Sequence, residues 1–235
     1  MEIPQDTNSV ESLKNRLRHA YLEEQPERAQ ALLAELEGLV WEPEPENRQF
    51  LELYRVLLYE DRFSDGEALL RLENALSLTC RGQLPGVLSH EEILLMYHIA
   101  VCTDRTGRRD RAIGILEALA DHYGSTPLTR EEALRTQPMV LYSLSKYLGL
   151  SREYRRCIAV CDRGIALARE SGCCGFLSRT LYNRGWALLQ LGTTETRTAG
   201  MENLRQAYRL ADLLESEGET EHILGFWESN FTEKL

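Results

Sequence analysis

The 235-residue sequence predicts an all-α fold built from consecutive helical hairpins. Residues 181–192, LYNRGWALLQLG, place a small residue, Gly185, between the large residues Leu181 and Leu188 on one helical face. A glycine at that position lets a partner helix approach closely, and Gly192 is placed to end the helix. Apolar and polar residues do not alternate over any stretch as they would in a half-buried strand. Helices packed in pairs are therefore expected throughout the chain.

The expected repeat has a long period. Gly107, Gly149 and Gly192, each interpreted as the glycine that closes a first helix, are 42 and 43 residues apart. A tetratricopeptide unit, which is a helix–turn–helix repeat, has a period of roughly 34 residues. Longer loops or helices must absorb the difference. Stacked hairpins of this kind form a right-handed superhelical solenoid, which the sequence predicts as a single domain over residues 1–235.

The first two hairpins are predicted from helix-start signals. The first spans residues 8–37, and Pro26 begins its second helix because proline is tolerated in the first turn of a helix. The second hairpin spans residues 47–79. Within it, Ser64 is the expected N-cap of the second helix, with Glu67 at the position that completes a capping box.

The third hairpin spans residues 89–123 and begins with the same signal, since Ser89 is followed three residues later by Glu92. Terminal repeats of a solenoid need a helix that covers the exposed end. Two further hairpins and such a capping helix are expected at about residues 136–171, 175–216 and 219–231.

The distribution of charge weighs against direct DNA binding. Residues 1–80 carry 8 basic and 17 acidic side chains, residues 81–192 carry 15 and 11, and residues 193–235 carry 4 and 9. The formal net charge is −10, without a dense stripe of basic residues. Contacts to phosphates dominate the affinity of proteins for nucleic acid, so direct contact between this chain and DNA is not expected.

The sequence also predicts the compartment. No apolar run approaches the roughly 18–20 residues that span a bilayer, and the N-terminal residues lack the basic and apolar regions of a signal peptide. We therefore expect a cytoplasmic protein with no membrane partner. The six cysteines have no spacing typical of a disulfide framework, and we interpret them as reduced thiols.

No group of residues predicts catalysis. The five histidines show no HExxH spacing, and the nucleophile elbow, the phosphate-binding loop and the dinucleotide fingerprint are all absent. Cys157 and Cys161 lie four residues apart on one helical face, which is compatible with a metal or redox site or with small core residues. No histidine or further cysteine completes a tetrahedral site by its spacing, so the core interpretation is favoured. Neither an enzyme, a cofactor nor a metal is expected.

A stack of hairpins has a concave surface lined by the first helix of each pair. Asn183 lies there beside Tyr182, and its side chain can both donate to and accept from a peptide backbone. Alternatively, Asn183 braces the neighbouring hairpin and Lys146 is merely solvated, and both interpretations remain open. Alignment of the first helices on their closing glycines places in the groove Tyr97, Val101, Asp104, Arg105, Ser143, Lys146, Tyr147, Arg179, Tyr182, Trp186 and Gln190.

The motifs LYNRGWALLQLG, REYRRCIAVCDRGIALA and RRDRAIGILEAL resemble tetratricopeptide repeats across residues 89–211. Together with LENALSLT, EEILLMYHIA and VLYSLSKYLG, they resemble the C-terminal sensor region of bacterial helix-turn-helix regulators, including peptide-pheromone receptors of the Rgg and PlcR type. The resemblance implies a groove that binds a short peptide, a homodimer, and DNA contact only through a separate N-terminal domain. That DNA-binding domain is expected to be absent from this chain, because no helix-turn-helix precedes residue 8.

The expected function is that of a peptide- or protein-binding sensor domain of a bacterial transcriptional regulator. Its ligand would lie in a groove around Lys146, Tyr182, Asn183 and Trp186. The alternative is a stand-alone scaffold that holds partner proteins and has no role in transcription. A third interpretation is a clamp for the terminal carboxylate of a partner, formed by the basic groove residues. The resemblance of the flanking hairpins to bacterial regulators favours the sensor over the clamp.

Overall fold

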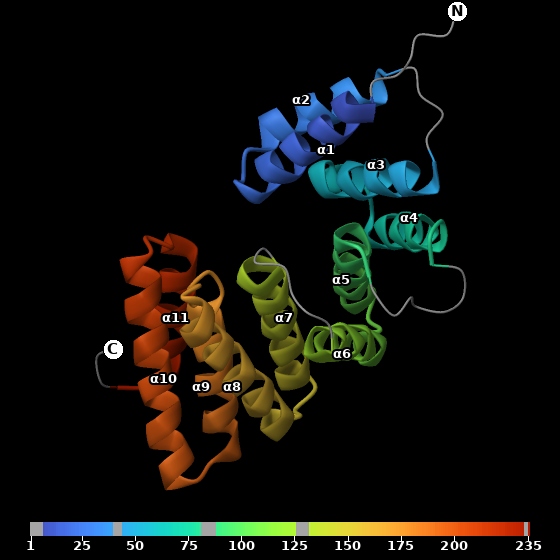
Figure 1. The fold of residues 1–235 in the computed structure, drawn as a ribbon. Helices are drawn as coiled ribbons and strands as arrows, with labels where there is room; N and C mark the ends of the chain where they lie inside the picture. Colours follow the sequence, from blue (N-terminus) through green and yellow to red (C-terminus); the bar gives the residue numbers. More distant parts are fainter. Residues whose placement is uncertain (1–6, 40–43, 81–87, 126–131, 233–234) are drawn as a thin grey trace, which may run out of the picture. The chain divides into compact units, whose positions relative to one another are not determined.

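The computed structural model describes residues 7–39, 44–80, 88–125, 132–232 and 235 (Figure 1). Within these ranges all regular structure is helical, which confirms the predicted all-α class. The helices form two compact units, here called the N-terminal unit (residues 1–106) and the C-terminal unit (residues 107–235). The organisation of the chain as a single domain stays a prediction.

Each helix of the N-terminal unit packs against the next one along the chain. The first two occupy the range expected for the first hairpin, and the next two that of the second. The elements are α1 (Thr7–Leu22), α2 (Pro26–Glu37), α3 (Pro45–Leu58), a 3₁₀ turn (Glu60–Arg62), α4 (Asp65–Ser77) and α5 (His90–Arg105).

The predicted capping boxes are present at the starts of α4 and α5. The hydroxyl of Ser64 accepts a hydrogen bond from the Glu67 backbone N–H, and the Glu67 carboxylate accepts one from the Ser64 backbone N–H. Ser89 and Glu92 form the same reciprocal pair. Each box satisfies two backbone donors that a helix start leaves without partners, so both start sites are confirmed.

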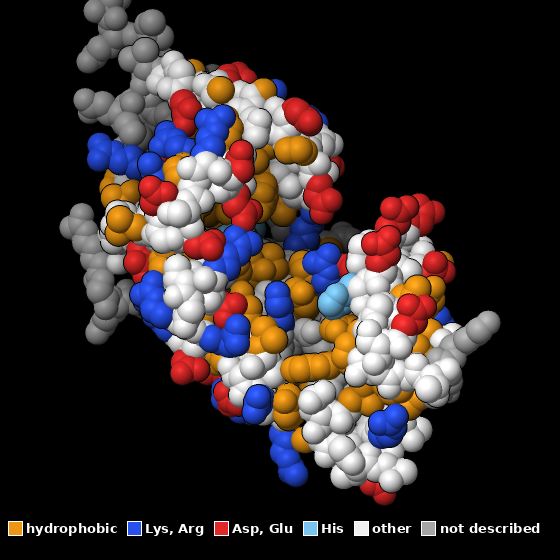
Figure 2. Space-filling model, turned by 180° about the vertical axis from the view of Figure 1, so that it is seen from behind, with side chains coloured by type: hydrophobic (Ala, Val, Ile, Leu, Met, Phe, Trp, Pro, Cys, Tyr) orange, Lys and Arg blue, Asp and Glu red, His pale blue; other side chains and the backbone are white. Residues whose placement is uncertain are grey.

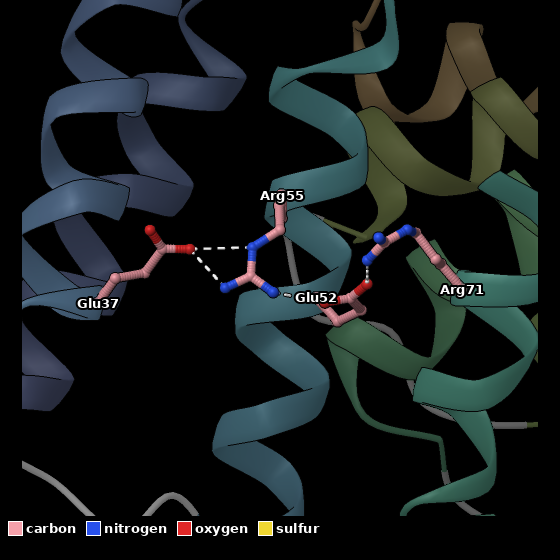
Figure 3. A network of polar contacts seen from close by, with 4 residues as sticks. All are labelled: Glu37, Glu52, Arg55 and Arg71. Atoms are coloured by element: carbon pink, nitrogen blue, oxygen red, sulfur yellow. Dashed lines mark hydrogen bonds and ion pairs between the residues drawn. The ribbon is translucent and has the colours of Figure 1, made fainter. Parts of the chain in front are cut away.

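Ion pairs connect three successive helices of the N-terminal unit (Figure 3). Arg55 on α3 lies 2.6 Å from Glu37 on α2 and 2.7 Å from Glu52 on its own helix. Glu52 in turn lies 2.5 Å from Arg71 on α4. The four side chains therefore form a continuous chain of alternating charge from α2 to α4.

The C-terminal unit continues the same pattern of consecutive packing, with additional contacts of α7 with α9 and of α9 with α11. Its helices are again close to the expected ranges. The elements are α6 (Arg109–Ser125), a π-helical turn (Glu132–Thr136), α7 (Gln137–Leu150), α8 (Tyr154–Ser171), α9 (Leu177–Leu191), α10 (Thr194–Leu213) and α11 (Glu217–Asn230).

Two glycines allow α9 and α10 to cross at very short distance. A Cβ atom built on Gly185 would lie 2.8 Å from the Gly200 carbonyl oxygen, and one built on Gly200 would lie 2.9 Å from the Gly185 carbonyl oxygen. Any side chain at either position would force the two backbones apart. The expectation that Gly185 admits a close partner helix is thus confirmed.

The turn after α7 differs from the prediction. Gly107 and Gly192 do adopt left-handed backbone conformations, with φ of 83° and 75°. Gly149, however, lies inside α7 and is buried, and the left-handed position after this helix is taken by Arg152, with φ of 65°. Gly149 is therefore not a closing glycine, and the left-handed residues are 45 and 40 residues apart.

The two units differ in charge. Residues 1–106 contain 20 acidic and 10 basic side chains, whereas residues 107–235 contain 17 of each. The whole formal net charge of −10 thus belongs to the N-terminal unit. Among the described helices, none is both long enough and apolar enough to cross a membrane.

Candidate ligand-binding site

The C-terminal unit contains a cavity of about 730 Å³ between α7, α9 and α11. Binding sites for small ligands typically have volumes of roughly 300–1,000 Å³, so this cavity has the size of a ligand site. The space-filling view in Figure 2 shows apolar side chains beside basic ones on a hollowed part of the surface. The cavity is lined by Tyr142, Ser145, Lys146, Leu150, Arg179, Tyr182, Asn183, Trp186, Ser216, Gly218, Glu219, His222, Ile223 and Phe226.

Aromatic rings on all three helices form much of the cavity wall. On α7, the Tyr142 ring stacks on Phe176, with centroids 5.7 Å apart. On α9, the Tyr182 ring meets His222 and Phe226 of α11 edge-on, at 4.9 and 5.7 Å. Burial raises the pKa of both Tyr142 and Tyr182, so both phenols stay neutral at physiological pH. Such walls offer apolar area together with hydroxyl groups that hydrogen-bond.

Asn183 connects α9 to α7 beside the cavity. Its side-chain nitrogen donates a hydrogen bond to the Ser145 hydroxyl at 2.9 Å, and the Asn183 side chain is largely buried. The side-chain amide nitrogen of Asn183, which is its hydrogen-bond donor, is therefore already bonded within the fold. This geometry supports the interpretation of Asn183 as a brace between neighbouring hairpins.

The two cationic side chains of the cavity have different environments. Arg179 Nε lies 2.5 Å from Oε1 of Glu219, and the other carboxylate oxygen, Oε2, accepts a hydrogen bond from the Ser178 hydroxyl. The Arg179 guanidinium additionally lies over the Tyr142 ring, 5.8 Å from its centroid. Lys146, by contrast, is exposed on α7. Arg179 thus ties α9 to α11, and the Lys146 ammonium is accessible to an anionic group.

The structure brings together five of the twelve residues predicted for the groove. Lys146, Arg179, Tyr182, Asn183 and Trp186 line the cavity.

The other predicted residues lie elsewhere. Ser143 and Tyr147 are buried in α7, and Gln190 is exposed near the end of α9 without lining the cavity. Tyr97 and Arg105 belong to α5 of the N-terminal unit, as do Val101 and Asp104. There Arg105 lies 2.5 Å from Glu60.

The misplacement of Ser143 and Tyr147 follows from the turn after α7. Alignment on Gly149 shifts α7 by three residues relative to alignment on Arg152, which turns each position by about 60° around the helix. With Arg152 as the landmark, Tyr142 corresponds to Tyr182, since each lies ten residues before the left-handed residue. Tyr97 on α5 has the same position relative to Gly107.

The wall formed by α11 was not predicted from the sequence. Glu219, His222, Ile223 and Phe226 recur at three- and four-residue spacing, which places them on one helical face. The α11 helix was expected only to cap the last hairpin. Because α11 follows α10, it has the place that the first helix of a sixth pair would have. First helices line the groove, so this place in the repeat order could have predicted a groove-lining face on α11.

The cysteines do not assemble a site in the described part of the chain. All six are free thiols, and Cys157 and Cys161 are buried on α8. A hydrogen bond between these two thiols, together with burial, raises the pKa of Cys161 well above its ordinary value. No three potential metal ligands gather among the described residues.

Comparison with known proteins identifies the fold. No protein-family model and no curated protein matches the sequence. The crystal structure of Bacillus thuringiensis PlcR in complex with the peptide PapR7 and DNA matches with a TM-score of 0.73 at 17% identity, over 94% of this chain and 76% of that one. The apo form of RapI matches with a TM-score of 0.65 at 10% identity, over 92% and 74% of the two chains.

The putative kinesin light chain of Podosopora anserina, which contains nearly identical TPR-like repeats, matches with a TM-score of 0.61 at 14% identity. That match covers 92% of this chain and 99% of the other. The chain therefore has a tetratricopeptide-like helical-repeat fold, similar to those of PlcR and RapI. The predicted resemblance is confirmed at the level of the fold.

Proposed function

We propose that the C-terminal unit binds a short peptide, or an extended segment of a protein, in the cavity between α7, α9 and α11. The main observation in support of this proposal is the cavity itself, which has a volume of about 730 Å³ and aromatic side chains on all three helices. Aromatic walls bind apolar side chains, and the exposed Lys146 offers a positive charge at the same site. A segment that carries both apolar and acidic groups matches this lining.

The binding event regulates transcription together with a DNA-binding domain, and the chain acts as a homodimer. PlcR, whose structure contains a peptide and DNA, has the same fold, and this likeness supports a regulatory role. A peptide that touches all three helices stabilises one arrangement of them over others, and in a dimer it thereby shifts the population of dimer geometries. Arg179 and Glu219 already join α9 to α11, so that a ligand bound there contacts two linked helices.

Thermal melting in the presence of pooled synthetic heptapeptides tests this function. A ligand selective for the folded state raises its stability by about 2.7 kcal/mol at a hundred times its Kd. We expect one or more pools to raise the Tm of the wild-type chain, and the Lys146→Ala variant to lose that shift. Arg155→Ala is the matched control, because Arg155 is also exposed in the C-terminal unit but does not line the cavity.

Asn183→Ala requires a different comparison. Loss of the hydrogen bond to Ser145 lowers the Tm even without peptide, because it removes a link between α7 and α9. The peptide-induced shift must therefore be measured from the Tm of the ligand-free variant. A complete absence of shifts in the wild-type chain, over all pools, contradicts the proposed function.

A scaffold for folded partner proteins is the second candidate. The observation that favours it is the similarity to the repeats of a putative kinesin light chain, which matches nearly the whole of both chains. In that case a captured protein partner, but no heptapeptide pool, raises the Tm. Lys146→Ala then leaves the binding of the partner unchanged.

A further inference from the structure

The indole of Trp186 lies directly against the backbone of α7 at Gly149. A Cβ atom built on Gly149 would be 2.7 Å from Cζ3 and 3.3 Å from Cε3 of the indole. Contacts of 2.7 Å are too short for two carbon atoms, so the indole occupies the space that a side chain at position 149 would need. Of the α7 residues that line the cavity, Lys146 and Leu150 flank Gly149 in the sequence.

Residues of α8 lie beside the indole and beside Gly149. The Tyr154 ring of α8 meets it edge-on, with the centroids 5.7 Å apart and the planes at 81°. The buried thiol of Cys157 lies 3.6 Å from the same Cβ position. Trp186 also lines the cavity, so the cavity offers open space into which the ring can move.

We infer that Gly149 determines the size of the ligand side chain that the cavity admits beside Trp186, an inference that rests on the proposed function. Glycine lets the indole lie against α7 and leaves the adjacent part of the cavity open. A larger residue at position 149 pushes the indole into the cavity and reduces that space. Gly149 does not itself line the cavity, so it acts through Trp186 as a specificity-determining residue.

The chemistry of this part of the wall identifies the class of side chain. Trp186 and the 46%-exposed Leu150 present apolar surface to the cavity. Burial of a large apolar group against such surface is favourable in proportion to its area. The ligand position beside Trp186 therefore takes a large apolar residue of the size of leucine or phenylalanine.

A positional-scanning heptapeptide library tests the inference, with one position at a time fixed as Ala, Val, Leu or Phe. We expect the wild-type chain to select Leu or Phe at one position, and Gly149→Ala to prefer Ala or Val there, with about a tenfold loss of affinity for Phe. The double variant Gly149→Ala/Trp186→Leu, which makes room again, restores the preference for the large residue. Gly114→Ala is the control, because a Cβ at this helical glycine meets no atom within 4 Å.

A readout that needs no peptide accompanies the library. The chain contains three tryptophans, so the ¹H–¹⁵N spectrum of a labelled sample shows three indole signals, and that of Trp186 is identified by its loss in Trp186→Leu. We expect this signal to shift in Gly149→Ala and to stay in place in Gly114→Ala. An unshifted signal in folded Gly149→Ala means that the indole does not move, which overturns the inference.

The outcomes separate the inference from the proposed function. If the wild-type chain selects no peptide from the library, the proposed function fails, and the inference fails with it. If the wild-type chain selects a large apolar residue and Gly149→Ala selects the same residue, only the inference is overturned. Should Gly149→Ala not fold, the single variant Trp186→Leu decides: it must extend the preference towards larger residues, and an unchanged preference refutes the inference.

Discussion

The N-terminal and C-terminal units are built from the same kind of hairpin, and both contain ion pairs between helices, but a different kind of contact stands out in each. In the N-terminal unit, Glu37, Arg55, Glu52 and Arg71 form a continuous chain of ion pairs from α2 to α4. In the C-terminal unit, α9 and α10 approach until their backbones almost touch at two glycines. The strength of the ion pairs depends on solvent and salt, whereas the glycine crossing depends on how closely the two helix surfaces pack.

The units also differ in what their first helices present. The first helices of the C-terminal unit and α11 enclose a cavity with aromatic walls. In the N-terminal unit, α5 carries Tyr97 at the equivalent position, but next to it are the neutral His98 and, two turns further on, the charged Arg105, which pairs with Glu60. A repeat fold thus fixes where a groove lies, while the residues at a few first-helix positions decide whether the groove can hold a ligand.

The largest expected effect is that of Gly185→Ala in the C-terminal unit. The added methyl group would meet the Gly200 carbonyl oxygen at 2.8 Å, so α9 and α10 must separate. We expect the free energy of unfolding to fall by about 2–3 kcal/mol. Urea denaturation measures this loss, and hydrogen exchange of the α9 and α10 amides locates it in the C-terminal unit.

Gly114→Ala is the control for this variant. The residue lies in α6, and a Cβ there meets nothing within 4 Å. Alanine is the better helix former, so Gly114→Ala is expected to stabilise the protein by about 0.5–1 kcal/mol. Equal effects of the two substitutions would show that the close crossing contributes nothing beyond helix propensity.

A smaller effect is expected from pH, and it belongs to the N-terminal unit. Burial lowers the pKa of His98 on α5 to about 4, opposed by the Glu60 carboxylate and assisted by the Arg105 guanidinium. Unfolded His98 binds a proton below its ordinary pKa of about 6.5, whereas folded His98 stays neutral down to about pH 4. As the pH falls through this window, the free energy of unfolding therefore falls, by at most about 1.4 kcal/mol per pH unit.

Urea denaturation at pH 7 and pH 5 measures this dependence. The lowered pKa values of Glu67 and Glu92 affect stability only below about pH 4.5, outside the interval. His98→Gln should lose most of the difference between the two pH values. If the wild-type chain and His98→Gln respond equally, the pH dependence arises from other groups.

The smallest expected effect is that of Arg55→Met, which interrupts the ion pairs of Figure 3. These side chains are about one third exposed, so that solvent weakens their attraction, and we expect a loss of about 0.5–1 kcal/mol at low salt. At 1 M salt the loss should shrink, since the Debye length is then about 3 Å. Urea denaturation at the two salt concentrations tests this, with Arg16→Met, an exposed residue of α1, as the control.

Much of the fold could be predicted from the sequence because its signals are local. Capping residues such as Ser64 and Ser89 and the periodic apolar face of each helix act over a few residues, so the helices lie close to their expected ranges. The close crossing at Gly185 was also predictable, since a glycine between two large residues on one helical face leaves a gap that a partner backbone can fill.

The site was harder to predict because it depends on register. A closing position is defined by its left-handed backbone and not by its residue type, and Arg152 occupies one in place of a glycine. The alignment of α7 was therefore shifted by three residues. It left out Tyr142, which lines the cavity, and selected Ser143 and Tyr147, which are buried. The α11 wall was missed because its cavity-lining face becomes visible only when α11 is treated as a first helix.

The unequal distribution of charge has a consequence for rates of association. The whole net charge of −10 lies in residues 1–106, and the unit that holds the cavity has as many basic as acidic side chains. An acidic peptide is thus slowed on its approach by long-range repulsion, although its binding site is not itself negative. At an ionic strength of about 0.1 M, salt screens this field beyond roughly 10 Å. Association of acidic peptides should therefore become faster as ionic strength rises, and association of basic peptides should become slower.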